Sequence, residues 1–273
     1  MNRISLSNFL NNGVFRIFDN QDTFRVILNC DDFTNNTFNF VLEKNSKLNL
    51  LILNLKEDTV IEFNQKEGSF LRIECLYSGE HKNVKIAANI AKYAEIEGFF
   101  ADFSINDFHN KVDIHLNDIH AKGRIKLASL SSKKDNKNFD ISLYHHSPYT
   151  VGLIDNYGVC KDDAKLVFSG TSHIEKNSKN SKTKQNAKIM VFDRYSNAIA
   201  KPILKIDENE IEASHAATVG KISDDELFYL TSRGLSEETA KELITLGYLK
   251  PIVLEFNDEE IRDEISKIIE GRM

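Results

Sequence analysis

Apolar residues recur at every second position in short segments between about residue 37 and residue 212, and polar pieces separate the segments. A period of two is typical of β-strands whose two faces lie in different environments. Helical spacing is almost absent from this stretch. We therefore predict a mainly β fold, with its clearest strands at Leu48–Ile52, Val60–Phe63, Phe70–Tyr77, Val84–Ile86, Val112–Leu116, Ile125–Leu127, Ile141–Leu143, Leu166–Phe168, Ile189–Val191 and Ile203–Ile206.

Three architectures suit many short strands: a β-sandwich, a β-barrel and a β-solenoid. The dipeptides that mark two-residue antiparallel turns occur only once, at Asn12-Gly13, before the strand-rich stretch. Strands without tight hairpins can stack in register, coil upon coil, which favours the solenoid. The repeat has no clean period, so the pattern alone leaves the sandwich and the barrel open.

Helical spacing begins near residue 221. Ser223 and Glu226 form a capping box, which predicts a helix that ends at Gly234. A second helix is expected over 236–246, with acidic residues in its first turn. Pro251 follows it, and we expect this proline to stop the helix.

A third helix is predicted after Asn257, with Ile261, Ile265, Ile268 and Ile269 as an apolar stripe. The expected organisation is an N-terminal segment (1–36), a β-helix core (37–220) and a C-terminal helical subdomain (221–273).

Composition is that of an ordinary globular protein: 273 residues, 41% hydrophobic, 28% charged and a net charge of −6. The mild acidity gives no reason to expect nucleic acid or an anionic membrane as a partner. No apolar run is long enough to span a bilayer, and polar residues interrupt the start where a signal peptide needs an apolar region. Cys30, Cys75 and Cys160 lack the spacing of a disulfide framework or a zinc site, which favours a reducing cytoplasm.

Familiar catalytic motifs are missing: the sequence contains no GxxxxGK[ST], GxGxxG, HExxH or GxSxG. Histidines gather at His109, His115 and His120 and at His145-His146. On unbroken strands, His115 and His120 point to opposite faces, and so do the adjacent pair. We interpret these five as surface or core residues.

Several motifs in the C-terminal half resemble the SufB/SufD family, the scaffold subunits of the SUF iron–sulfur cluster assembly machinery. They are Phe168-Ser-Gly170, Lys184-Gln-Asn186 leading to Asp193, Lys201-Pro202, Glu210-Ile-Glu-Ala-Ser-His-Ala-Ala-Thr-Val-Gly220 and Glu226-Leu-Phe-Tyr-Leu-Thr-Ser-Arg-Gly234. The resemblance implies a right-handed parallel β-helix followed by a small helical subdomain.

The resemblance also implies partners. SufD-like subunits pair through their β-helices with a SufB-type subunit or with a second copy, and they offer their C-terminal helices to a SufC-type ABC ATPase. The apolar helix residues that would contain the ATPase contact are Leu227, Phe228, Tyr229, Leu243 and Leu246.

At the family's interface site, the correspondence is uneven. His215 falls on the interface histidine, a candidate ligand of iron or of a cluster, or a proton donor. Asn186 stands where SufB-type scaffolds carry the main cluster-assembling cysteine, Ala216 where they carry a glutamate, and Ala213 where some SufD-type chains have a cysteine. Thiolates hold iron–sulfur clusters, so the missing ligands favour a SufD-like subunit without catalysis of its own.

The expectation is therefore a non-enzymatic scaffold that binds no permanent cofactor, with iron or a cluster passing transiently through a subunit interface. A stand-alone β-helix that binds metal or acts as a chaperone through His215 is an alternative. A carbohydrate-active β-helix, such as a polysaccharide lyase, is a further one, but the sequence shows neither a secretion signal nor clustered calcium ligands.

Overall fold

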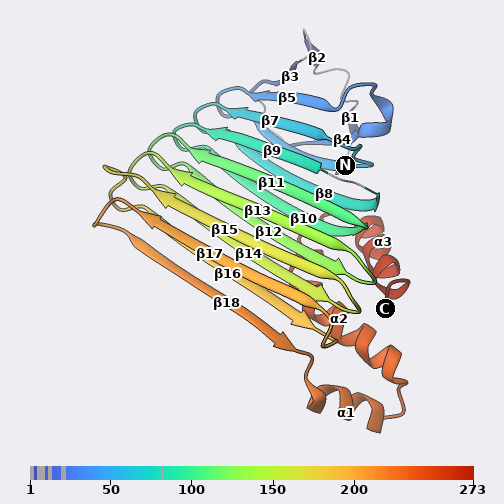
Figure 1. Cartoon of the computed structure of the whole chain (residues 1–273). Coiled ribbons are helices and arrows are strands. Elements are labelled where there is room, and N and C mark those ends of the chain that lie inside the picture. Colours follow the sequence, from blue (N-terminus) through green and yellow to red (C-terminus); the bar gives the residue numbers. More distant parts are fainter. Residues whose placement is uncertain (1–2, 5–9, 12–13, 20–22, 81–82) are drawn as a thin grey trace.

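The strands form a parallel β-solenoid that is followed by three helices (Figure 1). This computed structural model describes residues 3–4, 10–11, 14–19, 23–80 and 83–273. The predicted mainly β fold is confirmed, and so is the β-solenoid with C-terminal helices; the sandwich and the barrel are excluded. The dipeptide Asn12-Gly13 lies outside the described residues.

Successive coils contribute strands to two sheets. In the described part of the chain, each sheet has nine strands, and all neighbours run parallel except β2 and β3. Sheet A consists, in order, of β1 (Arg3–Ile4), β4 (Phe24–Asn29), β6 (Lys47–Leu53), β8 (Phe70–Glu80), β10 (Glu95–Ile105), β12 (Lys122–Ser131), β14 (Val151–Cys160), β16 (Lys182–Val191) and β18 (Glu212–Lys221). Sheet B consists of β2 (Leu10–Asn11), β3 (Val14–Ile17), β5 (Thr37–Leu42), β7 (Thr59–Gln65), β9 (Asn83–Ile90), β11 (Asp107–Leu116), β13 (Asn136–His145), β15 (Lys165–Ile174) and β17 (Asn197–Ile206).

Strands of successive coils are in register, so corresponding positions stack into columns. Some of these columns face the solenoid interior. One inward column of sheet A contains Leu50, Ile73, Gly98, Ile125, Ile154, Gln185 and His215. Neighbours in this column are between 23 and 31 residues apart along the chain. Because the coil length changes from turn to turn, the sequence shows no fixed period.

Corners between strands are made by single residues in the left-handed region rather than by two-residue hairpins. Asn45, Asp58, Asn106 and Asp162 adopt φ angles between 52° and 73°, as do other corner residues. Asn and Asp tolerate this conformation better than other residues with a side chain. The polar pieces in the sequence are therefore the corners of the coils.

Strand β10 was not among the clearest strands in the sequence, although it is one of the longest. Its alternation is hidden because both of its faces are buried: Phe100 points into the solenoid, and Phe99 and Phe103 point to the outer face. Helices cover that outer face.

The helices are α1 (Asp224–Ser232), α2 (Glu237–Val253) and α3 (Glu259–Glu270). Ser223 caps α1, since its Oγ accepts a hydrogen bond from the Glu226 backbone at 3.2 Å. The expected stop at Pro251 is wrong, because α2 continues through it to Val253. Pro251 lies in the last turn, and the burial of Leu249 and Ile252 against sheet A holds that turn helical.

Helices α2 and α3 pack on the outer face of sheet A, where they form a second apolar cluster. Its fully buried members from the helical subdomain are Leu249, Ile252, Phe256, Ile265 and Ile269. Ion pairs at the α2–α3 connection add to this contact, such as Arg25–Asp258 at 2.9 Å. Helix α1 differs, because none of its residues is buried, and it projects from the body in Figure 1. No helix in the described ranges has both the length and the apolar character needed to cross a membrane.

Candidate functional site

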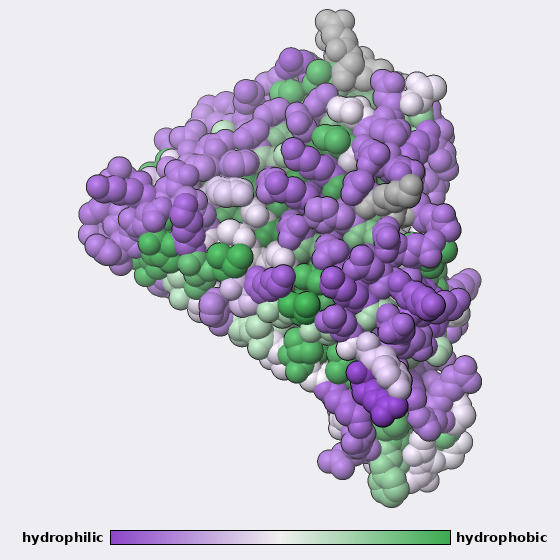
Figure 2. Space-filling model, viewed as in Figure 1, coloured by the Kyte–Doolittle hydropathy of each residue, from purple (hydrophilic) through white to green (hydrophobic). Residues whose placement is uncertain are grey.

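The last coil leaves an open end. Among the described residues, β17 and β18 each pair with a strand on one side only. Such an edge presents unpaired backbone N–H and C=O groups that can accept a further strand. Three large apolar side chains on these strands are exposed: Ile203, Ile206 and Val219. Figure 2 shows apolar side chains gathered along the border on which β18 lies, while most of that face is polar.

His215 lies on this open end. It is exposed on β18, on the face that continues the inward column of sheet A, next to Gln185 of β16. Gln185 Nε2 donates to Ser172 Oγ at 2.7 Å and to the Ile203 carbonyl at 3.0 Å. The interior is therefore apolar along most of the column and polar beneath His215, and the imidazole is accessible to a partner.

The other positions of the family site divide between the two faces of sheet A. Asn186 points outward and donates to Asp155 Oδ1 at 2.7 Å, and Ala216 is its register partner on β18. Ala213 shares the face of His215, next to Thr183. Strand alternation thus places Asn186 and Ala216 on the opposite face from His215, although Asn186 lies on the adjacent strand and Ala216 directly follows His215 on β18.

All three cysteines are buried and free. Burial raises the pKa of Cys30 to about 12 and that of Cys160 to about 11. The pKa of Cys75 is also well above its usual range, again because of burial. These groups stay protonated thiols at neutral pH, whereas cluster ligation requires thiolates.

Among the described residues, the other histidines lie on sheet B or at its corners. His109 contacts the Asp140 carboxylate at 2.8 Å, and His120 lies between the rings of Tyr93 and Tyr149 at a corner. His145 is fully buried, and its Nδ1 lies 2.8 Å from Thr150 Oγ1.

Two histidines from different parts of the sequence meet on the outer face of sheet B. His115 Nδ1 lies 3.0 Å from His146 Nε2, across 31 residues of chain. The sequence did not indicate this contact, because the lengths of the intervening coils determine it. Within the described ranges, no group of three or more His, Cys, Asp or Glu side chains is arranged to hold a metal ion.

The predicted docking residues of the helices differ in exposure. Phe228 and Tyr229 of α1 are 73% and 57% exposed, and Leu243 of α2 is 45% exposed. Leu227 is partly buried, and Leu246 is partly buried against the outer cluster of sheet A. Leu246 thus packs on the solenoid, whereas Phe228, Tyr229 and Leu243 present apolar surface to solvent.

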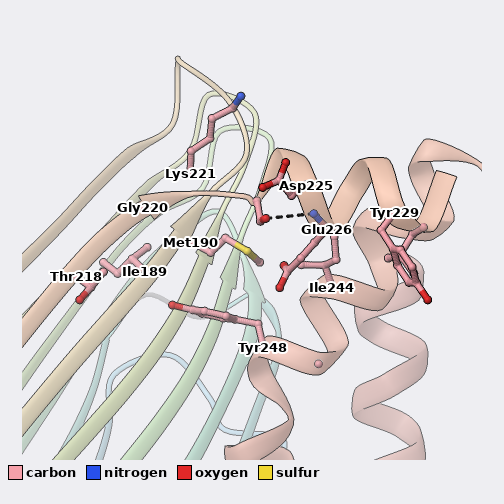
Figure 3. Close-up of a pocket in the computed structure, with 13 residues that line it drawn as sticks. Ile189, Met190, Thr218, Gly220, Lys221, Asp225, Glu226, Tyr229, Ile244 and Tyr248 are labelled. Carbon is pink, nitrogen blue, oxygen red and sulfur yellow. Dashed lines mark hydrogen bonds between the residues drawn. The ribbon is translucent and has the colours of Figure 1, made fainter. Parts of the chain in front are cut away.

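A cavity of about 810 Å³ separates α1 from the body of the protein (Figure 3). Ile189 and Met190 of β16 line one side, and Tyr229 of α1 with Ile244 and Tyr248 of α2 lines the other. Burial raises the pKa of Tyr248 to about 12, so it remains a neutral phenol. The residues that line the cavity connect β18, at the open end, to the exposed helix α1. No motif in the sequence predicts this cavity.

Comparisons with known proteins point to one family. Residues 11–248 match the family described as "SUF system FeS cluster assembly, SufBD core domain". The iron–sulfur cluster assembly protein SufD of Bacillus subtilis is 31% identical over 151 residues, which cover 55% of this chain and 35% of that protein. An iron–sulfur cluster assembly SufBD family protein of Staphylococcus saprophyticus is 29% identical over 56% of this chain and 33% of its own length. The match thus covers about a third of each relative, and the chain belongs to the SufBD core family of the SUF system.

Proposed function

We propose that this chain is a SufD-like scaffold subunit for iron–sulfur cluster assembly that catalyses no reaction of its own. Its family membership and the names of its relatives support the assembly role. The buried, protonated thiols support the absence of independent cluster chemistry, since the chain exposes none of its three cysteines as a ligand. The same free thiols fit a reducing cytoplasm.

The observation that carries the proposal is the open end of the solenoid. Strands β17 and β18 are ten residues long and carry exposed apolar side chains on an unpaired edge. An edge of this kind requires a cover, and a second β-helix edge supplies one by continuing both sheets. The partner is a SufB-type subunit or a second copy of this chain.

Helix α1 and the exposed part of α2 form the proposed docking surface for a SufC-type ABC ATPase. Phe228, Tyr229 and Leu243 present apolar side chains that the rest of the chain leaves exposed. The cavity beside Tyr229 can admit a side chain of the partner. Anchoring comes from α2 and α3, whose buried faces hold the surface on sheet A.

His215 is the proposed contact with the cargo. Its imidazole is exposed at the mouth of the last coil, so at the subunit interface it can bind iron or donate a proton. Iron or the cluster is cargo, and the missing thiolates come from the partner subunit. No permanent cofactor is required.

Reconstitution tests this role. The ATPase and the SufB-type subunit of the same organism are supplied with iron, sulfide and reductant, with and without this chain, and cluster formation is followed by absorbance. We expect cluster formation to depend on this chain. Equal cluster formation without it would contradict the proposal and favour a stand-alone metal-binding or chaperone module.

A further inference from the structure

The His115–His146 pair on the outer face of sheet B brings two ring nitrogens close enough for both to bind one ion. The two imidazole rings are nearly coplanar, with 7° between their planes, and their centroids are 5.3 Å apart. His115 Nδ1 and His146 Nε2 therefore point at each other across 3.0 Å and share one hydrogen bond. Both rings are partly accessible to solvent.

Glu175 determines which ring nitrogen of His146 carries the proton. Its Oε2 lies 2.9 Å from His146 Nδ1, on the side of the ring away from His115. This contact places the His146 proton on Nδ1, so Nε2 carries the lone pair and accepts the hydrogen bond from His115 Nδ1. A carboxylate behind a histidine is the usual second-layer arrangement at metal sites, because it orients the ring and raises its basicity.

Tyr144 and Asp113 complete the surroundings. The Tyr144 ring stacks on His115 at 4.6 Å with 9° between the planes, and this contact orients the His115 ring. Asp113 precedes His115 by two residues on the same face of β11; its Oδ2 pairs with Lys111 Nζ at 3.2 Å, and its buried Oδ1 has no hydrogen-bond partner in the described structure. The carboxylate is therefore already paired with a cation and is not counted among the ligands.

The chemistry of the two rings suits a transition-metal ion. A neutral imidazole offers a lone pair to a metal ion, and imidazole suits zinc, copper, nickel and iron.

We propose that His115 Nδ1 and His146 Nε2 bind a divalent first-row transition-metal ion, with water in its remaining positions. In the bound state, the rings turn so that both lone pairs meet the ion, the shared hydrogen bond is lost, and the His115 proton moves from Nδ1 to Nε2. With metal–nitrogen bonds of about 2.0–2.1 Å, a separation of 3.0 Å corresponds to an angle of roughly 90° at the metal. That angle suits square-planar or octahedral ions, so Cu²⁺ and Ni²⁺ bind more tightly than tetrahedral Zn²⁺.

Titration calorimetry with Cu²⁺ and Ni²⁺ on the full chain without an affinity tag tests the site. The expected result is one tight ion per chain. His115→Ala and His146→Ala should each abolish that binding, and Glu175→Gln should weaken it about 10- to 100-fold. His109→Ala is the matched control, because His109 is also on the outer face of β11 but pairs with Asp140.

A readout other than affinity comes from electron paramagnetic resonance of the Cu²⁺ form, which should show nitrogen ligands that His146→Ala removes. Circular dichroism confirms that each variant is folded. Absence of binding, or binding that survives both alanine substitutions, would overturn the proposal. Loss of binding in His109→Ala would also overturn it, since the ion would then lie elsewhere.

Discussion

His215 and Gln185 are register partners on β18 and β16, at the open end of the solenoid. Gln185 is buried and held by Ser172 and by the Ile203 carbonyl, whereas His215 is exposed on the last strand. The inward column of sheet A thus ends with the hydrogen-bonded amide of Gln185, and the accessible imidazole of His215 lies beside it. A partner subunit that continues sheet A would cover His215.

His215→Ala should therefore affect assembly rather than folding. We expect a marked loss of cluster formation in the reconstituted complex, with a change in the free energy of unfolding within about 0.5 kcal/mol because the side chain is exposed. Absorbance of the cluster and urea denaturation measure the two quantities. His109→Ala is the control and should change neither; a large loss of stability in His215→Ala would mark a structural histidine.

Two leucines of the helical subdomain offer a matched test of the docking surface. Leu243 and Leu254 are 45% and 58% exposed, but only Leu243 belongs to the proposed ATPase contact. Leu243→Ser should weaken ATPase binding at least tenfold, which corresponds to about 1.4 kcal/mol, and Leu254→Ser should not. Calorimetric titration of the ATPase compares them, and equal effects of the two substitutions would argue against this surface.

The interior of the solenoid contains a buried ion pair. Lys137 Nζ lies 2.7 Å from Asp102 Oδ2, and both side chains are fully buried. Lys137→Ala leaves the carboxylate unpaired, so it should lower the free energy of unfolding by about 3–5 kcal/mol. Urea denaturation followed by circular dichroism measures the loss.

Lys122→Ala is the control for that substitution. Its ion pair with Glu95 at 3.6 Å is exposed, so its loss should cost about 0–1 kcal/mol. The double variant Asp102→Ala with Lys137→Ala should lose less stability than Lys137→Ala alone. If the two lysine variants are equally stable, the buried pair does not stabilise the fold.

Cysteine reactivity tests the burial of the thiols. With pKa values of about 12 for Cys30 and about 11 for Cys160, and that of Cys75 also raised, very little thiolate is present at pH 8. Iodoacetamide should leave the native chain unmodified in mass spectrometry and should modify all three sites in concentrated urea. Rapid labelling of any of them in the native state would contradict the described burial.

The β class could be predicted from the sequence because period-two segments have a direct structural cause. The missing hairpin dipeptides favoured a solenoid, and the family resemblance was needed to choose it over a sandwich or a barrel. The helix capped by Ser223 was also predictable, because a capping box acts within a single turn. The path of α2 through Pro251 was not, since it depends on the burial of Leu249 and Ile252 against a distant sheet.

The site was predictable only in part. Resemblance singled out His215, but not that it continues an inward column or that Asn186 lies on the opposite face. The contact of His115 with His146 depends on the lengths of the intervening coils, which follow no fixed repeat. Contacts that depend on the register between coils can therefore be identified only from the structure.

Co-expression of this chain with the SufC-type ATPase of the same organism, followed by mass determination by light scattering, tests the scaffold most directly. We predict a stable complex that contains the ATPase and a pair of scaffold chains, either two copies of this chain or one copy with a SufB-type subunit. The measured mass distinguishes these two pairings. A monomer that leaves the ATPase unbound, with Phe228, Tyr229 and Leu243 intact, would contradict the account.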